Sequence, residues 1–321
     1  MHNARVPDAN HEEWITLQTT AGWRDVSDRS RLCLLGDDRA AFLHGQVTND
    51  IKALAEHTGC YAAIVSAKGK MESDLFVYRL ADELLLDFEP GLTGAVITRL
   101  ENFIIAEDVE VADAAPHFSQ LTLQGPAAGA VLAALGLPTP GEPLAVEKTG
   151  NEIFVINQPR LGTCGFDLFV PVAEVDAIKA QLEVHAPECG KAAFEKARVL
   201  ATIPRFGVDF DESNLAPEAG IEARAISYAK GCYIGQEIIA RIRTYGKVNR
   251  ILRGLRLDQP VAEGTELMLG DKEVGQLTSV TTEPNSALAI VHRDAAEVGT
   301  ELKAGIANAT VASLPFEAIA L

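Results

Sequence analysis

The segment with the clearest chemical character runs K-G-C-Y-I-G-Q-E from residue 230 to residue 237. It places the thiol of Cys232 between a lysine, Lys230, and a glycine, Gly235, in a pattern typical of a tight loop. An ammonium group at Lys230 favours the thiolate form of a nearby sulfur, and Gly231 and Gly235 leave the backbone open to a ligand. We therefore predict that Cys232 is a functional thiol and that Lys230 assists it. The alternative is a cysteine buried for packing, the usual fate of a free thiol, against which the polar neighbours argue.

The other cysteines and the histidines predict neither a disulfide framework nor a metal site. The cysteines are five in number and never stand in C-x-x-C spacing: Cys33, Cys60, Cys164, Cys189 and Cys232. The seven histidines are scattered, without an H-E-x-x-H pattern. We expect reduced thiols and no metal centre made by this chain alone.

A basic segment follows the thiol. Residues 238–257 include no acidic side chain and six basic ones: Arg241, Arg243, Lys247, Arg250, Arg253 and Arg256. The whole chain carries a formal charge of −17, which disfavours nucleic acid and anionic membranes as partners. The segment is either a solvated face or a site for a small anion, because a nucleic-acid duplex calls for a more extended basic surface.

Composition predicts a globular protein without a membrane anchor. The chain has 321 residues, of which 47% are hydrophobic, enough for one large core or two to three smaller ones. It contains no run of eighteen apolar residues, and the first dozen residues are polar, which we interpret as a mobile tail without a signal region. We expect a cytoplasmic protein and, in the absence of a heptad pattern, a monomer.

The spacing of apolar residues predicts an α+β body followed by a small β-barrel. We expect strands in the body at residues 75–78, 84–86 and 153–156. Helices are expected at residues 91–103, 127–135, 172–185 and 192–203. Short strands separated by glycine and aspartate turns are expected at residues 254–257, 264–267 and 272–277. The predicted domains are therefore a body at residues 1–247 and a barrel at residues 248–321.

Motifs along most of the chain carry a family resemblance. Four of them, in chain order, are F-L-H-G-Q-V-T-N-D at residues 42–50, K-G-K at 68–70, P-E-A-G-I at 217–221, and K-G-C-Y-I-G-Q-E at 230–237. The chain resembles the folate-binding YgfZ-type proteins, relatives of the aminomethyltransferase (T-protein, GcvT family) of the glycine cleavage system. The K-G-K segment is interpreted as a hairpin turn and is assigned no site.

The resemblance implies a fold and a ligand. The fold would be two interwoven ferredoxin-like units and a C-terminal β-barrel in a disc-like, three-domain arrangement, with tetrahydrofolate or a derivative in a central channel. Glu218 would hold the pterin ring, because a carboxylate accepts two parallel N–H donors. The resemblance further implies that Thr48, Asn49 and Asp50 line the channel, although alone they are turn-forming residues. The remaining expected folate-site residues are Tyr233, Gln236, Glu237, Arg241 and Arg243.

One departure from the family pattern bears on activity. Aminomethyltransferases carry an essential aspartate after the strand at residues 84–86, and an ungapped count places Gly94 there. We therefore predict a tetrahydrofolate-binding accessory protein that supports assembly or repair of iron–sulfur clusters in partner enzymes. The alternatives are a folate-dependent aminomethyl or one-carbon transferase, and a part in tRNA modification, indirect because the chain's acidity argues against direct RNA binding.

Overall fold

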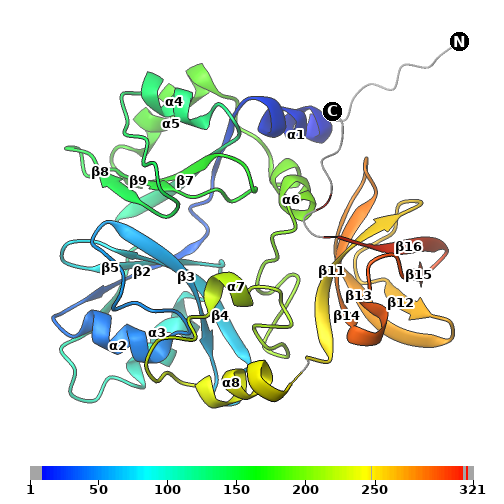
Figure 1. The fold of residues 1–321 in the computed structure, drawn as a ribbon. Helices are drawn as coiled ribbons and strands as arrows, with labels where there is room; N and C mark the ends of the chain where they lie inside the picture. The colour runs from blue at the N-terminus through cyan, green and yellow to red at the C-terminus, as the bar shows by residue number, and fades with distance from the viewer. Residues whose placement is uncertain (1–8, 247, 314–315, 317–321) are drawn as a thin grey trace, which may run out of the picture. The chain divides into compact units, whose positions relative to one another are not determined.

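The computed structural model describes residues 9–246, 248–313 and 316, and its contacts divide the chain into two units (Figure 1). The first unit combines residues 9–27 with residues 116–203. The second combines residues 28–115 with the described chain from residue 204 onward. This alternation confirms the prediction of two units interwoven in sequence. Among the described residues, no helix is long and apolar enough to span a membrane.

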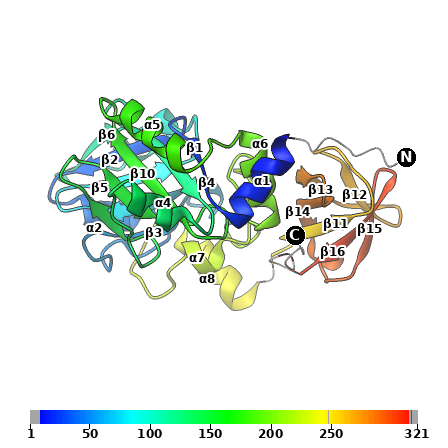
Figure 2. The same ribbon diagram turned by 90° about the horizontal axis from the view of Figure 1, so that it is seen from above.

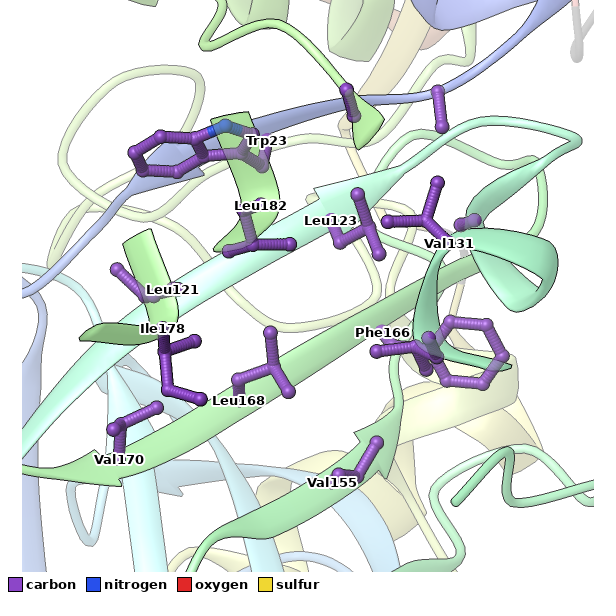
Figure 3. Close-up of a cluster of buried hydrophobic side chains, with 14 of the residues drawn as sticks. Trp23, Leu121, Leu123, Val131, Val155, Phe166, Leu168, Val170, Ile178 and Leu182 are labelled. Carbon is purple, nitrogen blue, oxygen red and sulfur yellow. The ribbon is translucent and has the colours of Figure 1, made fainter. Parts of the chain in front are cut away.

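The first unit is an antiparallel sheet packed against helices. The strand order is β1-β7-β10-β9-β8, with bounds β1 Gly22–Asp25, β7 Phe118–Gln124, β10 Gly165–Pro171, β9 Phe154–Asn157 and β8 Val146–Lys148. Alternate residues of β7 and β10, among them Leu121, Leu123 and Leu168, point into a core shared with helices α4 (Ala128–Ala134) and α5 (Val175–His185) (Figure 3). Both helices confirm the sequence prediction.

Two further helices of the first unit, α1 (Ala9–Thr19) and α6 (Lys191–Leu200), pack against each other. Trp14 and Leu17 of α1 lie three residues apart and are buried in a cluster with alanines of α6. The expectation of a mobile tail over the first dozen residues was therefore wrong from Ala9 onward, because these apolar side chains give α1 a buried face.

The second unit contains a sheet of order β3-β4-β5-β2-β6, also antiparallel. Its strands are β2 Ser30–Leu35, β3 Thr58–Val65, β4 Met71–Arg79, β5 Leu84–Phe88 and β6 Glu110–Asp113. Helices α2 (Arg39–Gln46) and α3 (Thr93–Glu101) share a core with one face of this sheet, which receives Ala62 and Ile64 of β3. The alternate residues of β3 enter a second core on the opposite face.

That second core is formed by the chain between residues 206 and 239. Tyr61, Ala63 and Val65 of β3 pack there with apolar side chains of this later segment. The segment contains the short helix α7 (Glu222–Ala225) and the start of helix α8 (Gln236–Tyr245). One face of this sheet is thus covered by the chain segment that contains the K-G-C-Y-I-G-Q-E motif, and sheet and segment belong to the same unit.

The predicted hairpin turn between residues 66 and 70 joins β3 to β4. Gly69 adopts a positive φ of 72°, and its amide donates to the carbonyl of Ser66 over 2.8 Å. A Cβ atom on Gly69 would lie 3.1 Å from Ile238 of α8, so the turn packs closely on that helix. The turn prediction is confirmed.

The C-terminal strands form a closed antiparallel barrel (Figures 1 and 2). The order is β11-β14-β13-β12-β15-β16, with bounds β11 Arg250–Leu257, β12 Glu266–Leu269, β13 Lys272–Thr281, β14 Ser286–His292, β15 Glu301–Ala304 and β16 Ala307–Ala312. Closure removes exposed sheet edges, so a short chain can build an independent core from small and aliphatic residues. The predicted β-barrel is confirmed.

Candidate functional site

Two motifs that lie far apart in the sequence meet in the second unit. The end of α2 and the T-N-D loop, at residues 44–50, run beside residues 224–235 and are joined to them by hydrogen bonds. From the later segment, the amide of Ile234 donates to the carbonyl of Gly45 over 3.2 Å, and that of Ser227 to the carbonyl of Thr48 over 3.1 Å. We call this region the thiol-loop junction. It contains six of the predicted site residues: Thr48, Asn49, Asp50, Lys230, Cys232 and Tyr233.

Lys230 lies at the centre of the junction and is buried. Its Nζ donates to the carbonyls of His44, Val47 and Asn49 over 2.5, 2.6 and 2.9 Å. These bonds use all three ammonium donors, and two of the carbonyls lie at the C-terminal end of α2, where a cation is favoured. Burial lowers the pKa of Lys230 to about 8. The arrangement makes Lys230 a structural tie between α2 and the thiol loop, which the sequence did not predict.

The T-N-D side chains are largely occupied by contacts within the protein. The hydroxyl of Thr48 is fully buried; it donates to the carbonyl of Ala225 over 2.6 Å and accepts from the amide of Ala63 over 2.9 Å. The amide group of Asn49 donates to the carbonyls of Tyr61 and Arg224 over 2.8 and 3.1 Å. Thr48 and Asn49 therefore fix the loop against β3 and α7.

Asp50 and His44 form a close pair beside Lys230. The Nδ1 atom of His44 lies 3.2 Å from Oδ1 of Asp50, and the same oxygen accepts from the amide of Ala53 over 3.1 Å. Burial and the charge of Lys230 lower the pKa of His44, so the imidazole is held neutral near pH 7. His44 belongs to one of the motifs that carry the family resemblance, but neither its spacing nor the resemblance predicted a role for it.

Cys232 is exposed, which removes the alternative of a cysteine buried for packing. It follows Gly231, where an added Cβ would lie 3.7 Å from Nε2 of His44. The next residue, Tyr233, is buried and its ring lies 4.8 Å from Nζ of Lys230; burial raises its pKa to about 12. The loop thus presents the thiol to solvent, while Lys230 before it and Tyr233 after it are buried.

Gly235 has a different role from the one predicted. It adopts a positive φ of 82° directly before α8, and an added Cβ would lie 2.5 Å from the carbonyl oxygen of Ser66. The expectation that Gly235 leaves room for a ligand was wrong, because the β3–β4 turn occupies that space. Gln236 and the residues after it continue as helix α8 and not as loop.

Three of the predicted residues on α8, Glu237, Arg241 and Arg243, are exposed, and Gln236 is half-buried. Glu237 and Arg241 form an i,i+4 ion pair of 2.8 Å on the surface, a kind of pair that contributes little to stability. Arg243 lies with its guanidinium carbon 3.9 Å from the ring centre of Tyr228, whose hydroxyl donates to Glu222 over 2.5 Å. Of the basic segment, Lys247 lies outside the described residues.

Glu218 is buried in the second unit. Its Oε2 accepts from the amide of Leu215 over 2.9 Å, and its backbone carbonyl accepts from the amide of Leu252 in β11. This backbone hydrogen bond to β11 fixes the position of Glu218. Within the described part of the chain, the hydrogen bond from the Leu215 amide goes to Oε2 and not to Oε1.

A buried acidic group near the junction was missed by sequence reasoning. The hydroxyl of Tyr61 donates to Oδ2 of Asp74 over 2.5 Å, and both residues are buried. Burial, and then the charge of Glu89, raise the pKa of Asp74 to about 6. Burial alone would raise the pKa of Glu89, but its contacts with Arg29 and Arg205 hold it below the ordinary value. The pattern of residues along a single strand does not predict this contact, because Tyr61 and Asp74 lie on different strands.

A polar cavity of about 420 Å³ lies elsewhere in the second unit. Residues 207–211, 213 and 214 line it, together with barrel residues such as Glu273, Gln276 and His292. The lining residues that the structure describes include none of the predicted site residues. Within the described ranges, no group of three or more His, Cys, Asp or Glu side chains is placed to hold a metal ion.

Comparison with known proteins identifies the family. The family model described as the GCVT N-terminal domain matches residues 3–230. The chain belongs to this family. A second model, described as the CAF17 C-terminal beta-barrel domain, matches residues 250–316. The chain therefore combines a GCVT body with a CAF17-type barrel.

Individual relatives agree with this assignment. A chloroplastic protein of Arabidopsis thaliana, named as a transferase, is 30% identical over 88% of this chain and 67% of its own length. The aminomethyltransferase of Staphylococcus haemolyticus is 27% identical over 91% of this chain and 84% of its own length. The aminomethyltransferase T of Bartonella henselae has the same fold, with a TM-score of 0.89, 23% identity, and coverage of 95% and 89% of the two chains.

Proposed function

We propose that this protein binds tetrahydrofolate and supports assembly or repair of iron–sulfur clusters in partner enzymes, with Cys232 as its functional thiol. The observation that carries the proposal is the presentation of Cys232: the thiol is exposed, while Lys230 and Tyr233 on either side of the loop are buried. A packing role does not require such a loop. Membership of the GCVT family and the CAF17-type barrel support the folate and iron–sulfur parts of the proposal.

The residues near Glu218 fit a folate. A buried carboxylate suits the donor-rich edge of a pterin, because Oε1 can accept one N–H donor and Oε2, which also accepts from Leu215, has a second lone pair for the other. Arg241 and Arg243 would meet the anionic glutamate tail, since both are exposed on α8. Tyr233, Gln236 and Glu237 would shape the site between them. Bound folate supplies one-carbon chemistry; the protein's part is to bind and orient it.

Clusters need several thiolate ligands, usually four. Cys232 would therefore share a cluster with a partner protein or handle sulfur transiently. The cytoplasm, a monomeric state, and partners that are neither nucleic acid nor membrane remain our predictions, and a chloroplastic relative widens the choice of compartment.

The first test is calorimetric titration with tetrahydrofolate and its 5-formyl derivative. We expect wild type and Cys232→Ala to bind and Glu218→Ala to lose binding. Glu273→Gln is the matched control, because it removes an exposed carboxylate beside the polar cavity in the same unit. Binding that survives in Glu218→Ala and is lost in Glu273→Gln would move the site to that cavity. No binding by wild type would refute the folate proposal.

The role of the thiol is tested in cells that lack the protein. Wild type should restore the activity of iron–sulfur enzymes, and Cys232→Ala should not. The alternative function, aminomethyl transfer, is favoured by relatives named as aminomethyltransferases. Gly94 argues against it, since this exposed position on α3 cannot supply a carboxylate. Folate-dependent transfer that persists in Cys232→Ala would favour the transferase.

A further inference from the structure

The imidazole of His44 is placed between an acid and the thiol loop. Its Nδ1 is buried and lies 3.2 Å from Oδ1 of Asp50, an ion-pair distance, although among the described residues the contact lacks the geometry of a hydrogen bond. Its Nε2 faces the loop, where a Cβ on Gly231 would be 3.7 Å away. Cys232 is the next residue and is exposed. The ring therefore has one nitrogen toward a carboxylate and the other toward the peptide that carries the thiol.

The junction holds this arrangement in place. The backbone carbonyl of His44 accepts from Lys230, two residues before Cys232, over 2.5 Å. The amide of Ile234, two residues after Cys232, donates to the carbonyl of Gly45 over 3.2 Å. The thiol loop is thus fixed on both sides to the helix turn that carries His44. Such anchoring limits how far the loop that carries Cys232 can move from the ring.

We propose that His44 accepts the proton of the Cys232 thiol and that Asp50 positions the imidazole for this transfer. A histidine with one nitrogen toward a carboxylate is set to use the other as a base, the arrangement by which cysteine nucleophiles are activated. The inference rests on the proposed use of Cys232 as a thiol and is independent of folate binding.

The charges around His44 favour a neutral ring before the transfer. Lys230 and Lys52 disfavour the imidazolium, whereas Asp50 favours it; burial and Lys230 lead, and the pKa of His44 is lowered. A neutral imidazole can take a proton, which an imidazolium cannot. When the S–H proton moves to Nε2, the new positive charge on the ring is compensated by the Asp50 carboxylate near Nδ1 and by the sulfur anion that the transfer leaves.

The reaction with an alkylating probe follows directly. The S–H bond breaks and its proton passes to Nε2 of His44. The sulfur then displaces iodide from iodoacetamide, forming one carbon–sulfur bond, and the ring returns the proton to water. The same proton transfer would precede attack on a disulfide or persulfide sulfur, in which one S–S bond forms and another breaks.

The experiment measures alkylation of Cys232 by iodoacetamide in the full-length protein without folate. Peptide mass analysis separates Cys232 from exposed Cys164 and from half-buried Cys60, whose pKa is raised by burial to about 12. Rates are measured from pH 5.5 to 9 for wild type, His44→Asn and Asp50→Asn. Asp50→Asn keeps an oxygen acceptor for the amide of Ala53. His57→Asn is the matched control, because His57 is a half-exposed histidine beside Glu56.

We expect His44→Asn to lower the rate at pH 7 at least tenfold, and Asp50→Asn to lower it severalfold. Below pH 7 the rate in His44→Asn should fall about tenfold per pH unit, as for a thiol without a base, while the wild-type profile should be shallower. His57→Asn should follow wild type. Equal rates and profiles in wild type and His44→Asn, both folded by circular dichroism, would overturn the proposal. That result would leave the folate titration unaffected, so the two proposals fail separately.

Discussion

The Nζ atom of Lys230 lies 2.5 Å from the carbonyl oxygen of His44, a residue 186 positions earlier in the chain. The carbonyls of Val47 and Asn49 accept hydrogen bonds from its other two N–H groups. Carbonyls at the C-terminal end of a helix lack hydrogen-bond donors within the helix. Here the ammonium group of Lys230, in the thiol loop, supplies the donors. The loop that presents Cys232 is therefore part of the same hydrogen-bonded structure as the T-N-D turn.

Replacing Lys230 should destabilise the fold. We expect Lys230→Met to lower the free energy of unfolding by about 2–4 kcal/mol, because three carbonyls lose a charged donor, while removal of a buried charge offsets part of the loss. Urea unfolding at pH 7 measures the change. Lys68→Met is the control, since Lys68 is exposed in the β3–β4 turn. Equal midpoints for the two variants would show that the carbonyls do not depend on Lys230.

Gly235 should tolerate no side chain. We expect Gly235→Ala to lower the free energy of unfolding by more than about 3 kcal/mol, because the residue combines a left-handed backbone with a Cβ position 2.5 Å from the carbonyl oxygen of Ser66. Gly91 separates the two effects: its φ is also 82°, but an added Cβ would meet no atom of the described residues within 4 Å. Gly91→Ala should cost about 1–2 kcal/mol. Similar losses in both variants would mean that the contact with the turn relaxes without cost.

The contribution of the two hydrogen bonds of the Thr48 hydroxyl to stability can be measured in the same way. Thr48→Val keeps the shape of the side chain but removes a donor to Ala225 and an acceptor for Ala63. We expect a loss of about 2–3 kcal/mol in urea unfolding, since both backbone groups are left unpaired. Thr58→Val, at a more exposed hydroxyl bonded to Ala55, should cost less. An unchanged midpoint in Thr48→Val would contradict the assignment of this hydroxyl to the junction.

The regular elements could be predicted from sequence because their apolar spacing is a local property. The strand over residues 75–78 and the helix over residues 172–185 each have a buried face that the pattern reveals, and both are observed as β4 and α5. Helix α8 was missed because the glycines before it indicated a loop, and its start depends on how Gly235 packs on β3 and β4.

The site was predicted in part. The motif residues were named, but their contacts depend on chain segments far apart in sequence. Tyr61 and Asp74 illustrate this, because their contact follows from the register of β3 and β4, in which Tyr61 pairs with Phe76 and Ala63 with Asp74. The two side chains are diagonal neighbours across the strands. No spacing within either strand shows that a buried hydroxyl will meet a buried carboxylate.

Asp74 should make the stability of the protein depend on pH. Its pKa in the folded protein is raised to about 6, above the ordinary value of 3.8. Between these values the folded chain holds a proton that the unfolded chain has lost, so the contribution of Asp74 to stability is complete below pH 3.8 and is lost as the pH rises through 6. A difference of one in pKa between the folded and unfolded chain corresponds to about 1.4 kcal/mol of unfolding free energy.

Asp74→Asn removes this titration while keeping an acceptor for the hydroxyl of Tyr61. Relative to wild type, the variant should therefore gain about 2 kcal/mol in unfolding free energy between pH 4.5 and pH 7.5. Urea unfolding across this range measures the difference, and Asp271→Asn, at an exposed turn of the barrel, serves as the control and should change in parallel with wild type. A difference between Asp74→Asn and wild type that stays constant with pH would show that the Asp74 carboxyl does not retain its proton in the folded protein. In that case the Tyr61 hydroxyl would be donating to a carboxylate whose charge is balanced by the neighbouring arginines.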